Sequence, residues 1–209
     1  MKYTLITVLG LMMLVSGCLS EKNVITRHYT IEWSGNLNEA GTTNGPLIPG
    51  RCEIDQVEIS PMYEKTQIVN RSGSHEVTYY KYHQWAIRPS VAVMEVIRTY
   101  LEDADVFESV SARYSRNIPD YRFSTNIRRL EVIESKNLFQ AHLELDLKLI
   151  NNADGRILID HKANRTEDLA KKELNLFASA ISNMLVSELG TFEELIRQRS
   201  EEIIPEIPR

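Results

Sequence analysis

The chain has 209 residues, a formal net charge of −5 and 43% hydrophobic residues. This length and composition predict a globular protein in which one domain buries a proper core. The acidic balance and the scattered Lys and Arg residues argue against nucleic acid as a partner, because phosphate binding requires a basic surface.

The first segment has the pattern of a secretory signal peptide. Lys2 supplies a short positive region, and residues 3–15 form an apolar run that is shorter than the roughly 20 residues of a membrane-spanning helix. The run ends in Val15-Ser16-Gly17-Cys18, which resembles the lipobox of bacterial lipoproteins. We therefore expect residues 1–17 to be removed by cleavage between Gly17 and Cys18. Cys18 would then carry diacylglycerol and an N-linked acyl chain.

Acyl chains on Cys18 predict a membrane anchor, because each buried methylene contributes about 0.8 kcal/mol and two or more chains hold a protein on the bilayer. Leu19 and Ser20 follow Cys18 in place of an aspartate, which favours the outer membrane by the sorting rule of enteric bacteria. The expected location is its periplasmic face. We expect no cofactor beyond the covalent lipid. Cys52 then has no partner for an internal disulfide, and we expect it to be buried in a strand.

The mature chain is expected to form one domain. We predict a polar tether over residues 18–27, the domain over residues 28–200 and a flexible tail over residues 201–209. The domain begins with a strand at residues 28–33, where apolar and polar residues alternate. Residues 35–50, rich in Gly, Pro, Asn and Thr, predict a surface loop.

Strands and one helix are predicted next. The strands lie at residues 51–60, Gln67–Arg71, 76–86 and 106–114. The helix, between the last two strands, covers residues 88–104, with Pro89 in its first turn and apolar residues at helical spacing.

Two long strands follow, and the second has the clearest pattern in the sequence. Apolar and polar residues alternate over residues 139–149, as in an antiparallel strand with one buried face. This alternation places His142 and Asp146 on the solvated face. In the strand before it, the apolar phase slips between Ile127 and Leu130, which predicts a bulge or bend.

The C-terminal part predicts a hairpin and a long helix. Residues 151–155 form the turn, and residues 156–165 the returning strand. The helix is expected to start near Asp168 as N-cap and to be interrupted at Gly190 and Thr191. Its predicted buried residues are Leu174, Phe177, Ile181, Met184, Leu185 and Leu189. The excess of strands predicts an α+β fold with two layers, a mostly antiparallel sheet and two main helices packed on one face.

No pattern in the sequence indicates catalysis. The five histidines lie on separate predicted elements without the paired spacing of zinc ligands, and neither a phosphate loop nor a nucleophile elbow is present. We therefore predict no catalytic residue, no metal site and no enzyme activity. We then expect the function to reside in a binding surface. The predicted strand at residues 76–86 is rich in aromatic residues, and its Tyr80, Tyr82 and Trp85 are the candidate interaction residues. Strand alternation would leave about half of its aromatic residues in the core.

The order of several short motifs resembles that of the ABC-type transport auxiliary lipoproteins, from residue 28 to about residue 196. The matching motifs are Val57-Glu58-Ile59-Ser60-Pro61-Met62-Tyr63, Gln67-Ile68-Val69-Asn70-Arg71, Trp85-Ala86-Ile87-Arg88-Pro89, Phe107-Glu108-Ser109-Val110 and Asp120-Tyr121.

The resemblance implies a non-enzymatic auxiliary component of an Mce/ABC-type intermembrane lipid transport system. Its implied partners are a periplasmic Mce-domain protein and an inner-membrane ABC permease, and it implies a homo-oligomer. The alternative is a structural or assembly adaptor lipoprotein of the cell envelope with no role in lipid transport; a lipid-binding cavity or ring lumen would separate the two. A third hypothesis, an enzyme on a lipid anchor, would require a deep polar pocket that joins titratable residues.

Overall fold

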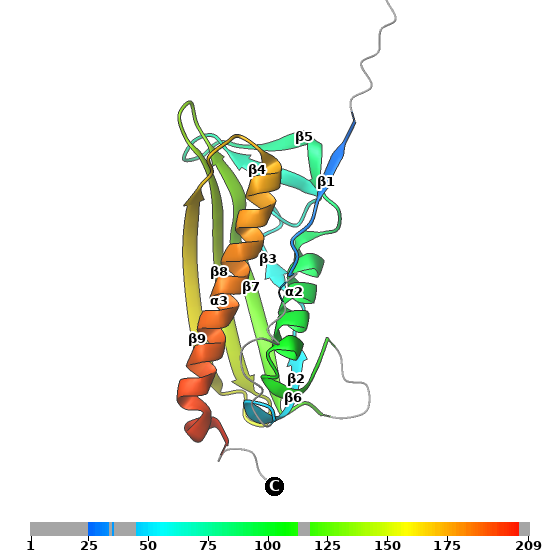
Figure 1. Cartoon of the computed structure of the whole chain (residues 1–209), viewed down its shortest axis with the longest axis vertical. Coiled ribbons are helices and arrows are strands. Elements are labelled where there is room, and N and C mark those ends of the chain that lie inside the picture. The colour runs from blue at the N-terminus through cyan, green and yellow to red at the C-terminus, as the bar shows by residue number, and fades with distance from the viewer. Residues whose placement is uncertain (1–24, 34, 36–44, 113–117, 205–209) are drawn as a thin grey trace, which may run out of the picture.

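A computed structural model of the chain describes residues 25–33, 35, 45–112 and 118–204 (Figure 1). Its strands are β1 (Arg27–Tyr29), β2 (Ile48–Ile54), β3 (Glu58–Ile59), β4 (Gln67–Arg71), β5 (Val77–Trp85), β6 (Phe107–Ser111), β7 (Tyr121–Glu134), β8 (Phe139–Asn151) and β9 (Ile157–Asp168). The helices α2 (Pro89–Asp103) and α3 (Leu174–Ile203) lie on the same face of the single sheet. The predicted two-layer α+β fold is confirmed.

Strand β7 is the centre of the sheet. Along one edge it pairs antiparallel with β8, which pairs antiparallel with β9. Along its other edge the short strands β2, β3 and β4 follow one another, all parallel to β7. Strand β6 extends the sheet beyond β2, and β5 and then β1 extend it beyond β4. Most paired residues are therefore antiparallel, as predicted, while the parallel pairings along β7 were not anticipated.

The core fills the space between β7–β9 and the two helices. The alternation over residues 139–149 buries all six of its apolar β8 side chains, and all of the predicted buried residues of α3 are buried. Aromatic pairs join the layers, with ring centroids 5.0 Å apart for Phe123 and Phe192 and 5.6 Å apart for Trp85 and Phe177. The predicted burial of Cys52 is confirmed, and this burial raises the pKa of its thiol.

The predicted irregularity in β7 is present. The register between β7 and β8 shifts between Ile127 and Arg129, which marks the expected bulge. After this bulge, Leu130 and Val132 face the core. The turn at residues 151–155 is also present, and Gly155 adopts a φ of 76° there.

Helix α3 differs from its predicted boundaries at both ends. Asp168 is the last residue of β9 and accepts a hydrogen bond from Gln140 Nε2 (2.6 Å), so the prediction that it caps α3 is wrong. The break predicted at Gly190 and Thr191 is also wrong, because the helix continues to Ile203 and buries apolar residues beyond that point. A Cβ on Gly190 would lie 3.4 Å from Tyr100 Oη, so this glycine leaves room for the contact with α2. The predicted tail also starts too early, since Ile203 is buried.

The segment after β1 leaves the sheet earlier than predicted. Beyond Tyr29 it crosses toward the helices, where the backbone N–H of Glu32 donates to Ser182 Oγ (3.2 Å). The Trp33 indole then packs on Tyr100 and donates to Asp103. The N-terminal segment thus packs against α3 and α2. No helix in the described part of the chain is long and apolar enough to cross a membrane.

Strand β2 starts inside the predicted loop, and Gly50 makes this possible. Its φ of 110° lies in the left-handed region, and the β2–β6 register is irregular around it. A Cβ at this position would lie 3.1 Å from Asp120 Oδ2 and 3.2 Å from the Tyr121 ring. The Asp120 carboxylate accepts a hydrogen bond from the next residue, Arg51 N–H (2.8 Å), so the two segments cannot separate freely.

We predict that Gly50→Ala lowers the free energy of unfolding by about 1–3 kcal/mol, because it adds backbone strain and a steric conflict. Gly73→Ala is the matched control, since the nearest atom to its Cβ would be 3.8 Å away. Urea unfolding followed by circular dichroism measures both. Equal stability of the two variants would contradict the assignment of strain to Gly50.

Candidate functional site

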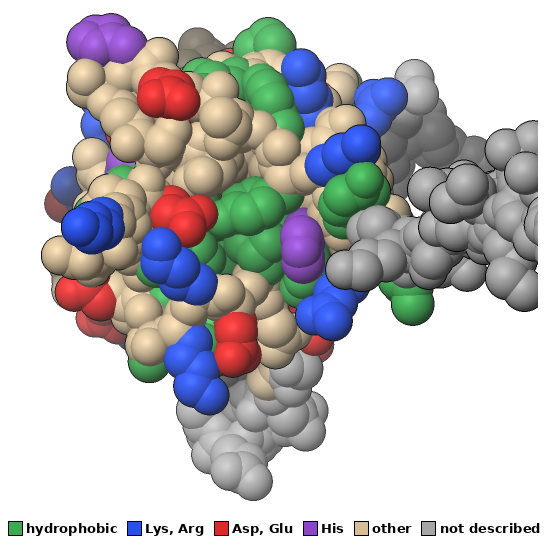
Figure 2. Space-filling model, turned by 90° about the horizontal axis from the view of Figure 1, so that it is seen from above, with side chains coloured by type: hydrophobic (Ala, Val, Ile, Leu, Met, Phe, Trp, Pro, Cys, Tyr) green, Lys and Arg blue, Asp and Glu red, His purple; other side chains and the backbone are tan. Residues whose placement is uncertain are grey.

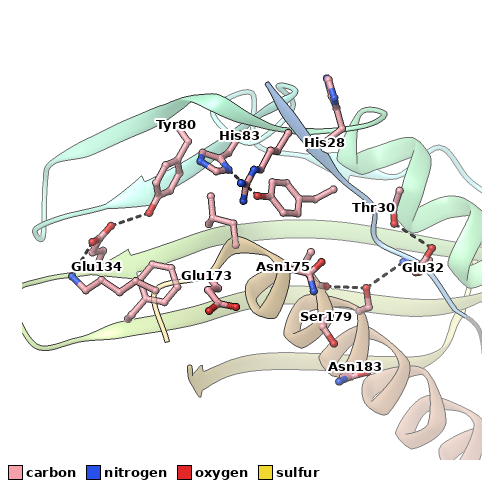
Figure 3. A pocket seen from close by; sticks show the side chains of 17 residues that line it. His28, Thr30, Glu32, Tyr80, His83, Glu134, Glu173, Asn175, Ser179 and Asn183 are labelled. Carbon is pink, nitrogen blue, oxygen red and sulfur yellow. Dashed lines mark hydrogen bonds and ion pairs between the residues drawn. The ribbon is translucent and has the colours of Figure 1, made fainter. Parts of the chain in front are cut away.

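A pocket lies beside β1, at the end of the molecule where the described part of the chain begins (Figure 3). Its volume is about 950 Å³, within the range of small-molecule sites. It is lined by β1 and the residues after it, by β5, by the adjoining ends of β7 and β8, and by residues 172–183 at the start of α3. The site is therefore built from segments that are far apart in the sequence.

The pocket combines an apolar base with a charged margin. Phe139, Leu174 and Ala178 line it and are each less than 10% exposed. Figure 2, which views this end of the molecule, shows hydrophobic side chains gathered in the middle and bordered by Lys or Arg, Asp or Glu, and a histidine. The pocket is lined by one arginine, Arg27, and one lysine, Lys172.

Strand β5 contributes Tyr80 and His83 to the pocket (Figure 3). His83 Nδ1 and the Tyr29 hydroxyl share a hydrogen bond of 2.7 Å, which ties β5 to β1. The Tyr80 ring meets the edge of the His83 ring, and its hydroxyl donates to Glu134 Oε2 (2.8 Å). Burial, together with this hydrogen bond, raises the pKa of Tyr80, so the phenol is neutral at physiological pH.

Glu134 connects three elements at the pocket margin. Besides Tyr80 from β5, it binds Lys172, just before α3, whose Nζ donates to Oε1 (2.9 Å). Asn70 from β4 lies at the limit of a hydrogen bond, at 3.4 Å. The hydrogen bond from Lys172, with a smaller one from Tyr80, lowers the pKa of Glu134 against the opposing effect of burial. Glu134 therefore carries a negative charge that holds β5 and the start of α3 around the pocket.

A second carboxylate, Glu131, lies three residues before Glu134 in β7 and is fully buried. It accepts hydrogen bonds from Tyr63 Oη (2.6 Å) and from Arg71 Nε and Nη2 (2.7 and 2.9 Å). His142 Nδ1 lies 3.4 Å from Oε1. Burial by itself would raise the pKa of Glu131, but the His142, Arg71 and Tyr63 side chains outweigh it and lower the pKa to about 2. Burial, together with the hydrogen bond to Glu131, raises the pKa of Tyr63 to about 12.

The prediction that His142 and Asp146 lie on a solvated face is wrong, since each is only 6% exposed. His142 is held between Glu131 and Asn164, whose Oδ1 is 2.9 Å from Nε2. Asp146 accepts two hydrogen bonds from Arg128 (2.9 and 2.6 Å). The predicted alternation of apolar and polar residues in β8 is present, but neighbouring side chains cover its polar face at His142 and Asp146.

These charged groups are engaged with one another. Across the described residues, no group of three or more His, Cys, Asp or Glu side chains is arranged to hold a metal ion. Sequence reasoning missed Glu131, although its place between the core residues Leu130 and Val132 was visible. Strand alternation assigns such a residue to the outer face and does not report what covers it.

The three candidate interaction residues lie in different environments. Tyr80 lines the pocket, whereas Tyr82 is 37% exposed outside it, with Lys81 Nζ 5.1 Å from its ring centre. Trp85 is only 3% exposed and packs on Phe177, so it belongs to the core and not to a surface. Gly17 and Cys18 lie outside the described residues, and their expected processing stays a prediction.

We predict that Glu131→Gln lowers the free energy of unfolding at pH 7 by about 3 kcal/mol, because it leaves Arg71 without its buried partner. Since the pKa of Glu131 is depressed, its contribution is present above about pH 4.5 and is lost as the pH falls toward 2. The difference between the wild type and the variant should therefore shrink over that range in urea unfolding. A difference that is constant with pH would contradict the depressed pKa.

We also predict opposite outcomes for two aromatic residues of β5. Trp85→Ala should lower the free energy of unfolding by about 3–5 kcal/mol, because it opens a cavity beside Phe177. Tyr82→Ala, at an exposed position, should change it by less than about 0.5 kcal/mol. Chemical unfolding monitored by circular dichroism measures both, and a large loss of stability in the Tyr82 variant would show that its exposed placement is incorrect.

Comparison with known proteins agrees with this fold. A crystal structure of a Xanthomonas campestris protein from a family of unknown function superposes with a TM-score of 0.65 and 17% identity, covering 77% of this chain and 92% of that one. A second crystal structure, of an uncharacterised protein, gives a TM-score of 0.64 and 9% identity, covering 82% and 99%. At these identities the likeness shows the fold alone.

The sequence itself carries the family assignment. No protein with curated annotation matches the chain. The family described as the ABC-type transport auxiliary lipoprotein component matches residues 30–189, which include α2, the first half of α3 and every strand except β1. The chain belongs to the ABC-type transport auxiliary lipoprotein family.

Proposed function

We propose that this lipoprotein is the outer-membrane component of an Mce/ABC-type intermembrane lipid transport system. The observation that carries the proposal is the family match over residues 30–189, since the family is an auxiliary component of ABC-type transport. In this role the chain performs no chemistry of its own. A periplasmic Mce-domain protein and an inner-membrane ABC permease are the proposed partners, and the ATPase of that system would supply the energy.

The proposed anchor is Cys18, acylated after removal of residues 1–17. Eight residues lie between Cys18 and the start of β1 at Arg27. A chain of this length spans at most about 30 Å when fully extended. An anchor at Cys18 would therefore keep the pocket end of the domain close to the membrane surface. The opposite end, where α3 finishes, would reach furthest into the periplasm (Figure 1).

The described part of the chain supports a binding role over a catalytic one. Its buried carboxylates Glu131 and Asp146 each have hydrogen-bond donors in place, and the histidine beside Glu131 is held at Nε2 by Asn164. The pocket is open and lined from four directions, as expected for a site that receives a ligand or a partner segment. We propose that the protein docks the Mce-domain assembly, as a homo-oligomer, and positions it at the outer membrane.

The test is affinity capture of the lipidated protein, tagged after Arg209, from detergent-extracted membranes, followed by mass spectrometry. We expect an Mce-domain protein and an ABC permease to be recovered with the wild type. Cys18→Ser is the control, because it removes the acylation site and leaves the domain unchanged. Recovery of the two partners should fall strongly with this variant if membrane placement is required for assembly.

Recovery of unrelated envelope proteins alone would overturn the transport role. The structural or assembly adaptor would then be the better description. The intact mass of the captured chain provides a second readout, since acylated Cys18 must be its first residue. A mature protein without acyl chains would contradict the proposed anchor.

A further inference from the structure

We propose that the pocket beneath Tyr80 and His83 binds the head group of one phospholipid, in which a phosphate lies next to a primary ammonium group. This inference rests on the proposed function and names the ligand of the same site. The ligand class follows from three properties of the pocket, which are its position, its charges and its apolar base.

The first property is the position of the pocket in the domain. The pocket is at the end of the domain from which the N-terminal segment leaves, and the extended chain from Cys18 to Arg27 covers at most about 30 Å. Figure 2 shows hydrophobic side chains exposed in the middle of this end of the molecule, on the side of the proposed anchor. Phospholipid head groups are the ligands at highest local concentration on that side.

The charges of the pocket are of both signs and are not all neutralised within the protein. Lys172 and Glu134 form an ion pair with each other at 2.9 Å. The Arg27 backbone pairs with β5, but its side chain forms no hydrogen bond or ion pair with another residue in the described part of the chain. Glu32 accepts only a hydrogen bond from Thr30 (3.2 Å), and Glu173 lies 3.8 Å from the exposed Lys171. One cation and two carboxylates thus remain available to a ligand.

A zwitterionic head group matches this arrangement better than an anion does. Its phosphate would bind Arg27, aided by the first N–H groups of α3, where no side chain caps the helix. Its ammonium would bind Glu173 or Glu32, which also line the pocket. A purely anionic head group would leave both carboxylates without a partner and would be repelled by them.

The apolar base accounts for the remainder of the lipid. Phe139, Leu174 and Ala178 present a surface suited to the glycerol ester region, and the Tyr29 and Tyr80 rings lie beside it. The volume of about 950 Å³ is sufficient for a head group with the first part of its acyl chains. Attachment of acyl chains should therefore strengthen binding over that of the head group alone.

The test uses residues 19–209, which retain every core residue of the fold from Ile31 to Ile203. Dihexanoyl phosphatidylethanolamine, at concentrations at which it is monomeric, is titrated while backbone amide NMR signals are recorded. We expect saturable shifts at Leu174 and Asn175. Glycerophosphoethanolamine and inorganic phosphate distinguish a lipid site from a head-group or phosphate site, and dihexanoyl phosphatidylglycerol tests the preference for an ammonium group. We expect all three to bind at least about tenfold more weakly.

Two pairs of variants locate the site. Ser179→Trp fills the pocket from an exposed position on α3 and should abolish the shifts, whereas Ser187→Trp, exposed on the same helix outside the pocket, should leave them unchanged. Arg27→Glu should weaken binding about tenfold or more, because it removes a charged hydrogen-bond donor. Lys162→Glu, on the exposed edge strand β9, provides the same charge change without effect.

Several outcomes would overturn the inference. These are an absence of saturable shifts with the lipid, shifts that map away from α3, equal binding of inorganic phosphate, or full binding by Ser179→Trp. The partner capture described above separates this failure from that of the proposed function. If the Mce-domain protein is recovered but the lipid does not bind, the transport role stands and the pocket has another occupant, such as a partner peptide.

Discussion

Two carboxylates near the end of β7 hold this fold together at the pocket end. A carboxylate that is removed from water is destabilising unless donors surround it, so the buried Glu131 and the half-buried Glu134 each require several other elements to be in place. Glu131 draws in Tyr63 from the segment before β4, Arg71 from β4 and His142 from β8. The cluster therefore joins both sides of β7 with side-chain contacts, in addition to the backbone pairing.

Glu134 extends the same constraint to the helix layer. It accepts a hydrogen bond from Tyr80 of β5 and another from Lys172, which lies two residues before the start of α3. Strand β5 in turn holds β1, by parallel pairing and by the bond between Tyr29 and His83. The pocket is the space left between these tied segments. Its shape depends on ion pairs and hydrogen bonds at its margin more than on the hydrophobic core, which lies below it.

The core and the pocket end of the molecule are held together by different kinds of contact. The core between β7–β9 and the helices consists of interlocked apolar side chains and provides a rigid body. The pocket end is held by polar contacts that are individually weaker and partly exposed, such as the pair of Lys172 and Glu134. A site for a ligand or a partner at this end can adjust without disturbing the core. The proposed anchor leaves from the same end, which places the adjustable part of the molecule nearest to the membrane.

The sequence by itself determined the elements with strong periodicity and the local signals. The helix from Pro89, the long strand over residues 139–149, the bulge after Ile127 and the motif at Cys18 all depend on neighbouring residues, and the order of short motifs was sufficient for the family. Tertiary structure decided the remainder. Alternation predicts which face of a strand is polar, but only packing shows that Tyr63 and Arg71 cover Glu131 and that His142 is buried beside it. Gly190 signals a break in isolation, yet the apolar residues beyond it gain enough from burial to continue the helix. The pocket joins Arg27, Tyr80 and Lys172, and no local pattern relates residues so far apart, because their proximity arises only from strand order.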